Sequence, residues 1–240
     1  MALLEAENIT AHYGKVRALK GVSLRIEQGQ FVGLIGPNGS GKSTLLDTIS
    51  GLVSQWAGRL IYHGEDISTL TPAQRVARGL IHCPERRHLF PFMSVRDNLL
   101  LGSFSRTARE FMNENLSFVF SLFPVLKEKQ NDQAKTLSGG QAQMLALGRA
   151  ILSNPRLLML DEPMLGVAPV MRKEFSNALD RLRKKDISVL VTEQELFLTM
   201  KNTEIVHVLQ DGVFTHSGET AEYRSHTNLE GLYFCKKNKD

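Results

Sequence analysis

Residues 31–46 read FVGLIGPNGSGKSTLL, and this stretch decides the fold. It matches the pattern G-x-x-x-x-G-K-[ST], between an apolar run typical of a strand and a run typical of a helix. Glycines let backbone N–H groups curl around an anion, and a helix that begins near Lys42 points its positive end at the same place. We therefore predict a phosphate-binding loop in which Lys42 meets the outer phosphates and Ser43 meets Mg²⁺. The alternative, a chance glycine-rich turn, does not account for the flanking patterns.

Two adjacent carboxylates end a second apolar run, LLMLDEP at residues 157–163. Such a run is typical of a buried strand in a parallel sheet, where an unpaired charge is costly. Ligands of parallel sheets lie beyond the carboxyl ends of the strands, so we predict that this strand neighbours the one at residues 31–35. Asp161 would then hold Mg²⁺, and Glu162 would orient and deprotonate a water. The alternative is a pair of surface acids after a strand.

A third motif, LSGGQ at residues 137–141, lies upstream of these acids. Ser138 and Gln141 have the spacing of a capping box that opens a helix. The two glycines between them weaken the first turn and leave its backbone N–H groups exposed, which a plain helix cap does not require. The segment therefore predicts a second anion site in the same chain.

The pattern along the chain indicates an α/β fold with a mostly parallel sheet. The first 30 residues alternate as antiparallel strands do, with Gly21 and Gly29 as expected turn positions, and residues 84–155 have helical spacing. Strands then alternate with helices, which favours a parallel sheet. We expect one domain, 1–240, made of a nucleotide-binding core (1–85 and 156–220), an inserted helical subdomain (86–155) and a C-terminal tail (221–240).

Composition excludes several classes of protein. The net charge is only +4 and the basic residues are scattered, so we expect no nucleic-acid partner. No apolar run reaches the roughly 18 residues that a membrane span needs. The N-terminus, MALLEAENIT, lacks a signal-peptide layout, and we expect the protein in the cytoplasm.

The segments GPNGSGKST, LSGGQ and LLMLDEP, in this order and spacing, resemble those of the ATP-binding cassette family. The resemblance implies ATP and Mg²⁺ as cofactors and a pair of cassettes that sandwich two ATP molecules. The LSGGQ helix of one cassette would cap the nucleotide on the other. Residues that would contact nucleotide by this resemblance are Tyr13 stacked on adenine, Val16 beside it, Gly36, Pro37, Asn38, Gly39, Ser40, Gly41, Lys42, Ser43, Thr44, Glu85, Ser138, Gly139, Gly140 and Gln141. An ordinary strand tyrosine is the alternative for Tyr13.

Three positions depart from the common pattern of the family. Glu85 stands where a glutamine usually ends a strand, and a carboxylate there would contact Mg²⁺ or its water more strongly. Ala168 replaces a loop aspartate, and Gln194 replaces the switch histidine. Glutamine can hydrogen-bond a γ-phosphate or a water but cannot carry a proton. Because Glu162 is retained as the catalytic carboxylate, we expect an active ATPase, with Lys42 and Gln194 assisting.

At these three positions the chain resembles the shorter ATP-binding subunit of branched-chain amino acid importers, in which the same residues are usual. His88 and Met164 differ from the residues usual in that subunit. Urea and amide importers share much of the pattern. We expect a subunit that powers a bacterial importer on the inner face of the membrane. Separate permease subunits would dock on residues 86–102, and the second cassette would be a longer homologue or, as second choice, an identical copy. A regulatory cassette and a nucleotide-binding scaffold with negligible turnover remain the alternatives.

Overall fold

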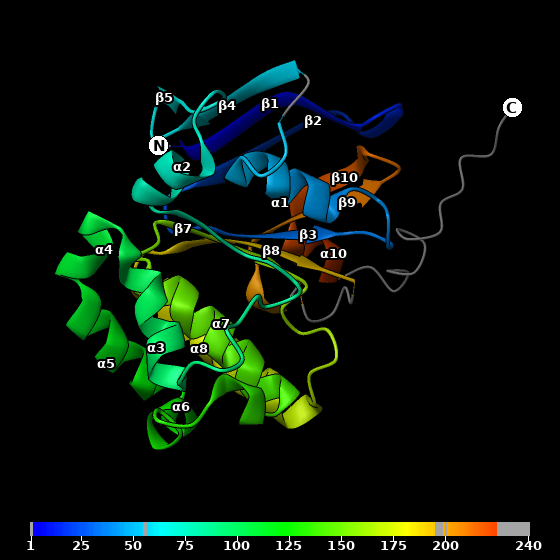
Figure 1. The fold of residues 1–240 in the computed structure, drawn as a ribbon. Helices are drawn as coiled ribbons and strands as arrows, with labels where there is room; N and C mark the ends of the chain where they lie inside the picture. The colour runs from blue at the N-terminus through cyan, green and yellow to red at the C-terminus, as the bar shows by residue number, and fades with distance from the viewer. Residues whose placement is uncertain (1, 55–56, 195–198, 200, 225–240) are drawn as a thin grey trace, which may run out of the picture.

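The structure is a computed structural model of the 240-residue chain, and it describes residues 2–54, 57–194, 199 and 201–224. Two β-sheets lie above a layer of helices (Figure 1). The upper sheet is antiparallel and has the order β2-β1-β4-β5. Its strands are β1 (Ala2–Tyr13), β2 (Val16–Glu27), β4 (Ala57–Tyr62) and β5 (Glu65–Asp66).

Gly21 does not form the expected turn. It lies inside β2 with φ at 93°, where the pairing with β1 shifts register. A glycine with positive φ at a register shift is typical of a β-bulge, which bends a strand without ending it. Gly29 does lie in the turn between β2 and β3.

The lower sheet has the order β10-β9-β3-β8-β7-β6, in which all neighbours are parallel except β10 and β9. Three central strands are buried along their whole length, as parallel strands covered on both faces must be. The strands are β3 (Phe31–Ile35), β6 (Leu80–Cys83), β7 (Leu157–Asp161), β8 (Ser188–Glu193), β9 (Ile205–Gln210) and β10 (Val213–Glu219).

The prediction that β3 and β7 are neighbours was wrong, because β8 lies between them. Strands in a sheet are about 4.8 Å apart, so the two carboxyl ends are separated by roughly twice that distance. Long side chains can cross this gap. The motifs therefore still meet at one edge of the sheet, but across an intervening strand.

Helices cover both faces of the lower sheet (Figure 1). Between the two sheets lie α1 (Lys42–Ser50) and α2 (Pro72–Ala77), of which α2 was not predicted. Below the lower sheet lies the helical segment, with α8 (Pro169–Arg183) behind it. The helical segment contains α3 (Val95–Leu100), η1 (Leu101–Phe104), α4 (Arg106–Glu110), α5 (Met112–Leu122), α6 (Pro124–Glu128), η2 (Ala134–Thr136) and α7 (Gly139–Leu152).

Among the described residues, two large hydrophobic cores hold these layers together. One packs α1 between the sheets, and the other packs α7 and α8 under the lower sheet. This architecture confirms the predicted fold class, while the boundaries assigned to the core, the helical subdomain and the tail stay predictions. Of the predicted tail, α10 (Thr220–Arg224) is described, and residues 225–240 lie outside the described part. Among the described residues, every helix falls short of the length and apolar character that a bilayer crossing requires.

Candidate nucleotide site

The glycine-rich loop joins β3 to α1 in the conformation that the motif predicts. Gly39 and Gly41 have φ values of 78° and 111°, which residues with a Cβ rarely adopt. Gly36 packs so tightly against the backbone of Leu209 that a Cβ there would collide with its carbonyl oxygen. No side chain caps the start of α1, so the first backbone N–H groups of the helix are left for an anion.

The Lys42 side chain lies folded into this loop and is only 4% exposed. Its Nζ donates to the carbonyl oxygens of Gly36 at 2.8 Å and Pro37 at 3.3 Å. The same ammonium lies 3.1 Å from Oε1 of Glu162, whose side chain is 9% exposed. A buried carboxylate at the end of β7 therefore has the charged partner that its burial requires.

Gln194 completes this cluster from the end of β8. Its Nε2 donates to Oε2 of Glu162 at 2.6 Å. The Glu162 backbone, which has a positive φ of 45°, donates its N–H to the carbonyl and hydroxyl oxygens of Thr192. The three residues predicted as catalytic, Lys42, Glu162 and Gln194, are thus brought together.

The three predicted metal ligands, Ser43, Glu85 and Asp161, line one cavity of about 520 Å³. Asp161 is 5% exposed, and its Oδ1 accepts a hydrogen bond of 2.6 Å from the Thr192 hydroxyl. Hydroxyl and carboxylate oxygens are the donors that Mg²⁺ prefers. No three acidic, histidine or cysteine side chains of the described residues are close enough to hold a metal by themselves. The donor set therefore fits Mg²⁺, which takes much of its coordination from phosphates and water.

The LSGGQ segment forms the predicted capping box. The Ser138 hydroxyl accepts from the Gln141 backbone N–H at 3.3 Å, and the Gln141 side chain accepts from the Ser138 N–H at 3.0 Å. Ser138 and Gly139 are exposed, and no residue of the segment lines the cavity of Ser43 and Asp161. This helix start is thus a separate surface.

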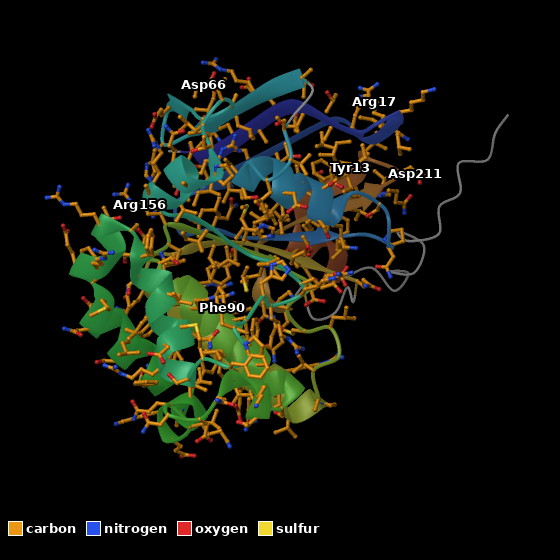
Figure 2. The ribbon with its side chains drawn as sticks, in the orientation of Figure 1. Tyr13, Arg17, Asp66, Phe90, Arg156 and Asp211 are labelled. Carbon is orange, nitrogen blue, oxygen red and sulfur yellow. The ribbon has the colours of Figure 1, made fainter. Side chains whose placement is uncertain are left out.

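Tyr13 and Val16 face each other across the turn of the β1–β2 hairpin, and both are exposed, by 51% and 67%. Figure 2 shows Tyr13 on the side of the molecule where β3 leads into α1. The glycine loop contacts the same hairpin, because a Cβ on Gly41 would lie 3.0 Å from the carbonyl oxygen of Ala18. An exposed aromatic ring therefore lies on the strand pair that contacts the phosphate-binding loop.

Comparisons with known proteins agree with this geometry. A model of the ABC transporter family matches residues 19–165. The chain is 37% identical over 210 residues to the high-affinity branched-chain amino acid transport ATP-binding protein BraG of Pseudomonas aeruginosa, covering 88% of this chain and 90% of that protein. This chain belongs to the ABC transporter family. Like the family's other cassettes, it is an ATPase that binds ATP.

Other relatives of this ABC ATPase differ in their transport systems. The lipopolysaccharide export system ATP-binding protein LptB of Escherichia coli K12 is 30% identical, covering 97% of both chains. The fold matches the crystal structure of the ADP conformation of MJ1267, an ATP-binding cassette of an ABC transporter, with a TM-score of 0.83. That match has 29% sequence identity and covers 98% of this chain and all of the other.

Asp47 and His82 of the ABC ATPase are among the polar residues that line the cavity of Ser43 and Asp161 and that sequence reasoning missed. Burial, and then the charge of Asp161, raises the pKa of Asp47. Burial lowers the pKa of His82, although Asp161 opposes this effect. His82 Nδ1 lies 3.7 Å from Asp47 Oδ1, and neither ring nitrogen of His82 has a hydrogen-bond partner.

A signal for one of these residues was present in the sequence. Asp47 follows Ser43 by one helical turn and therefore shares its face of α1. His82 carries no such signal, because it comes from β6, which only the sheet order places beside β7.

Proposed function

We propose that this chain is the ATP-hydrolysing subunit of a bacterial importer for branched-chain amino acids. The observation that carries the proposal is the 37% identity to the branched-chain amino acid transport protein BraG over most of both chains. The probable branched-chain amino acid transport protein LivG of Methanocaldococcus jannaschii, 30% identical over 92% of this chain, supports it further. The protein would lie in the cytoplasm, on the inner face of the membrane.

The buried cluster supports specific roles in hydrolysis. Lys42 would neutralise charge on the outer phosphates, and its ammonium would then leave Glu162. Glu162 would orient the attacking water and accept its proton, and Gln194 would hydrogen-bond the same water. Ser43, Asp161 and Glu85 would hold Mg²⁺, which when bound supplies positive charge against the phosphate oxygens.

The remaining contacts to nucleotide follow the loop and the hairpin. Backbone N–H groups of the loop would bind the phosphates, and Tyr13 with Val16 would hold the adenine. The residues proposed for the loop are Gly36, Pro37, Asn38, Gly39, Ser40, Gly41, Lys42, Ser43 and Thr44.

A second cassette, in our proposal a longer homologue rather than an identical copy, would bind ATP against the exposed start of α7. Gly139 is exposed there, and the Ser138 hydroxyl lies at its edge. The dimeric structure of the bacterial ABC transporter cassette MJ0796 shows that a cassette of this fold can pair. Residues 138–141 would then complete the site on the partner.

Permease subunits would dock on residues 86–102. Phe90 and Phe92 in this segment are 50% and 73% exposed, so they do not fill the core of the helical segment. Figure 2 shows Phe90 in front of the helices, on the surface that faces the viewer. Val95 and Leu99 of the same segment are buried and do fill that core. Exposed aromatic rings beside a helical core suit a groove for a partner helix.

Uptake by a strain that lacks this gene tests the proposal. We expect this strain to lose uptake of labelled leucine, isoleucine and valine. The wild-type gene should restore uptake, and the Glu162→Gln variant should not. Labelled urea and a short-chain amide serve as competing solutes, and their loss in place of the amino acids would contradict the proposal. LptB favours an export system as the second candidate. Normal uptake with defective lipopolysaccharide at the cell surface would support that candidate instead.

A further inference from the structure

A second cavity, of about 380 Å³, is lined by none of the three predicted metal ligands. Its walls come from the end of β4, the end of α2, the residues just before β7, and α4 of the helical segment. It shares no lining residue with the cavity of Ser43 and Asp161, which lies beyond the carboxyl ends of the strands. Figure 2 shows Arg156 at this place, between the sheets and α4.

Arg156 brings an uncompensated positive charge to this cavity. It forms no ion pair with any described residue, and its Nη1 lies 3.1 Å from Nε2 of His63. A guanidinium can only donate, so His63 must accept through Nε2 as the neutral imidazole. Burial and the charge of Arg156 both lower the pKa of His63, which agrees with a neutral ring. The other arginine of the cavity, Arg78, is neutralised by Glu65 at 2.7 Å.

Asn154 adds a hydrogen-bond donor to the cavity beside Arg156. Tyr62 also lines the cavity, but it is 2% exposed and its hydroxyl is buried, so it forms part of the wall and does not donate to a ligand. Burial raises the pKa of Tyr62, so the phenol stays neutral. The side-chain oxygen of Asn154 accepts from Asn115 at 3.4 Å, which leaves its amide N–H groups to donate elsewhere. An excess of donors around a positive charge indicates an anionic ligand.

The apolar part of the wall argues against a bare inorganic anion. Phe111 is 44% exposed, and Ala77 and the Tyr62 ring also line the cavity. The volume lies within the range of roughly 300–1,000 Å³ that is typical of small-molecule sites. A ligand with a charged end and an apolar body would satisfy both parts of the lining.

We propose that this cavity binds a small organic monoanion, a carboxylate with an apolar body, whose charge meets the Arg156 guanidinium and the Asn154 amide. Thr107 and Phe111 belong to the helical segment, whereas Tyr62 ends β4 and Arg156 directly precedes β7. A bound acid therefore bridges the two parts of the molecule. Binding here is separate from the nucleotide cavity and leaves the roles of Lys42 and Glu162 unchanged.

Calorimetric titration of the full chain without nucleotide tests this site. The probe is 4-methylpentanoate. Its two controls are 4-methylpentanamide, which has the same apolar body and no charge, and inorganic phosphate, which is an anion without an apolar body. We expect one 4-methylpentanoate per chain and no measurable heat from the other two. Arg156→Gln should weaken binding at least about tenfold, the loss of one charged hydrogen bond. Arg17→Gln removes the same charge from an exposed site at the opposite end of the molecule (Figure 2) and should change nothing.

Three results would overturn the assignment: no binding of 4-methylpentanoate to the wild-type chain, equal affinity in wild type and Arg156→Gln, or binding of the amide or phosphate as tight as that of the acid. Arg156 is exposed, so its substitution should leave the fold intact, and the melting temperature checks this. A second variant, Phe111→Ser, removes the apolar wall and not the charge. Phe111→Ser should also weaken the binding of 4-methylpentanoate. Unchanged affinity would count against the apolar contact.

Discussion

The two regions of this ABC ATPase that we propose to bind nucleotide are built in opposite ways. At the edge of the lower sheet, Lys42 and Glu162 are buried and form an ion pair, and the half-buried Gln194 donates to Glu162. At the start of α7, the side chains of Ser138 and Gln141 bond only within their own turn, and Gly139 is exposed. The first region is assembled before any ligand arrives. The second presents backbone groups to the outside and, in our proposal, needs a partner cassette to form a site.

Because of this difference, variants of the buried cluster should affect a single chain, whereas variants at the start of α7 should have an effect only in a pair of cassettes. Changes in the buried cluster should alter the chemistry and stability of the isolated chain. Changes at the start of α7 should spare nucleotide binding by the isolated chain and appear only when two cassettes meet.

The largest effect is expected from Glu162→Gln. Loss of the proposed general base should lower ATP turnover about 10²- to 10⁴-fold, measured as phosphate release by the purified chain with its partner subunits. Nucleotide affinity should persist, because the amide keeps the shape of the side chain. A turnover rate within twofold of wild type would remove Glu162 from the role of base.

The ion pair between Lys42 and Glu162 predicts strong coupling in stability. Lys42→Met leaves a carboxylate that is 9% exposed without its cation and should cost about 3–5 kcal/mol of unfolding free energy. The double variant Lys42→Met, Glu162→Gln should regain much of this loss. Urea denaturation of both single variants and the double variant closes the cycle. Simple additivity would mean that the buried cluster is not preassembled.

A smaller effect is expected from Thr192→Val. This change removes the hydroxyl that bonds Asp161 at 2.6 Å and should weaken metal binding about 10- to 100-fold. The measurement is Mn²⁺ titration by electron paramagnetic resonance in the presence of a non-hydrolysable ATP analogue. Thr192→Ser keeps the hydroxyl and is the matched control. If the valine and serine variants bind Mn²⁺ alike, Thr192 does not position Asp161.

The smallest effect on stability is expected from Ser138→Ala, about 1 kcal/mol for a lost helix cap. Thr71 caps α2 with the same kind of capping box and offers a matched control. Both alanine variants should bind ATP normally as isolated chains and lose similar stability. Only Ser138→Ala should also lower turnover in the assembled transporter, and equal turnover in the two variants would leave the start of α7 as a plain cap.

Much of this arrangement could be predicted from local sequence patterns. The phosphate-binding loop, the strand before Asp161 and the capping box of Ser138 each depend on a short stretch with its own chemistry. The same capping rule would also have found α2, because Thr71 and Gln74 have the spacing of Ser138 and Gln141.

Strand order could not be predicted from the same patterns. Apolar β-strands carry no mark of which neighbour they pair with, so β3 and β7 were placed side by side. The contributions of Thr192 and His82 were missed for that reason, because each enters the site from a strand that the order alone brings there. The cavity around Arg156 was missed too, since it joins segments that are distant in the sequence.

The intervening strand β8 has a mechanical consequence. Thr192 donates a hydrogen bond to Asp161, the proposed metal ligand. Gln194, two positions further along the chain, donates one to Glu162, the proposed base. The end of β8 therefore positions both the proposed metal ligand and the proposed base. A small shift of the end of β8 would therefore displace Asp161 and Glu162 together. Such a shift would stop hydrolysis while the glycine-rich loop stays in place to bind ATP.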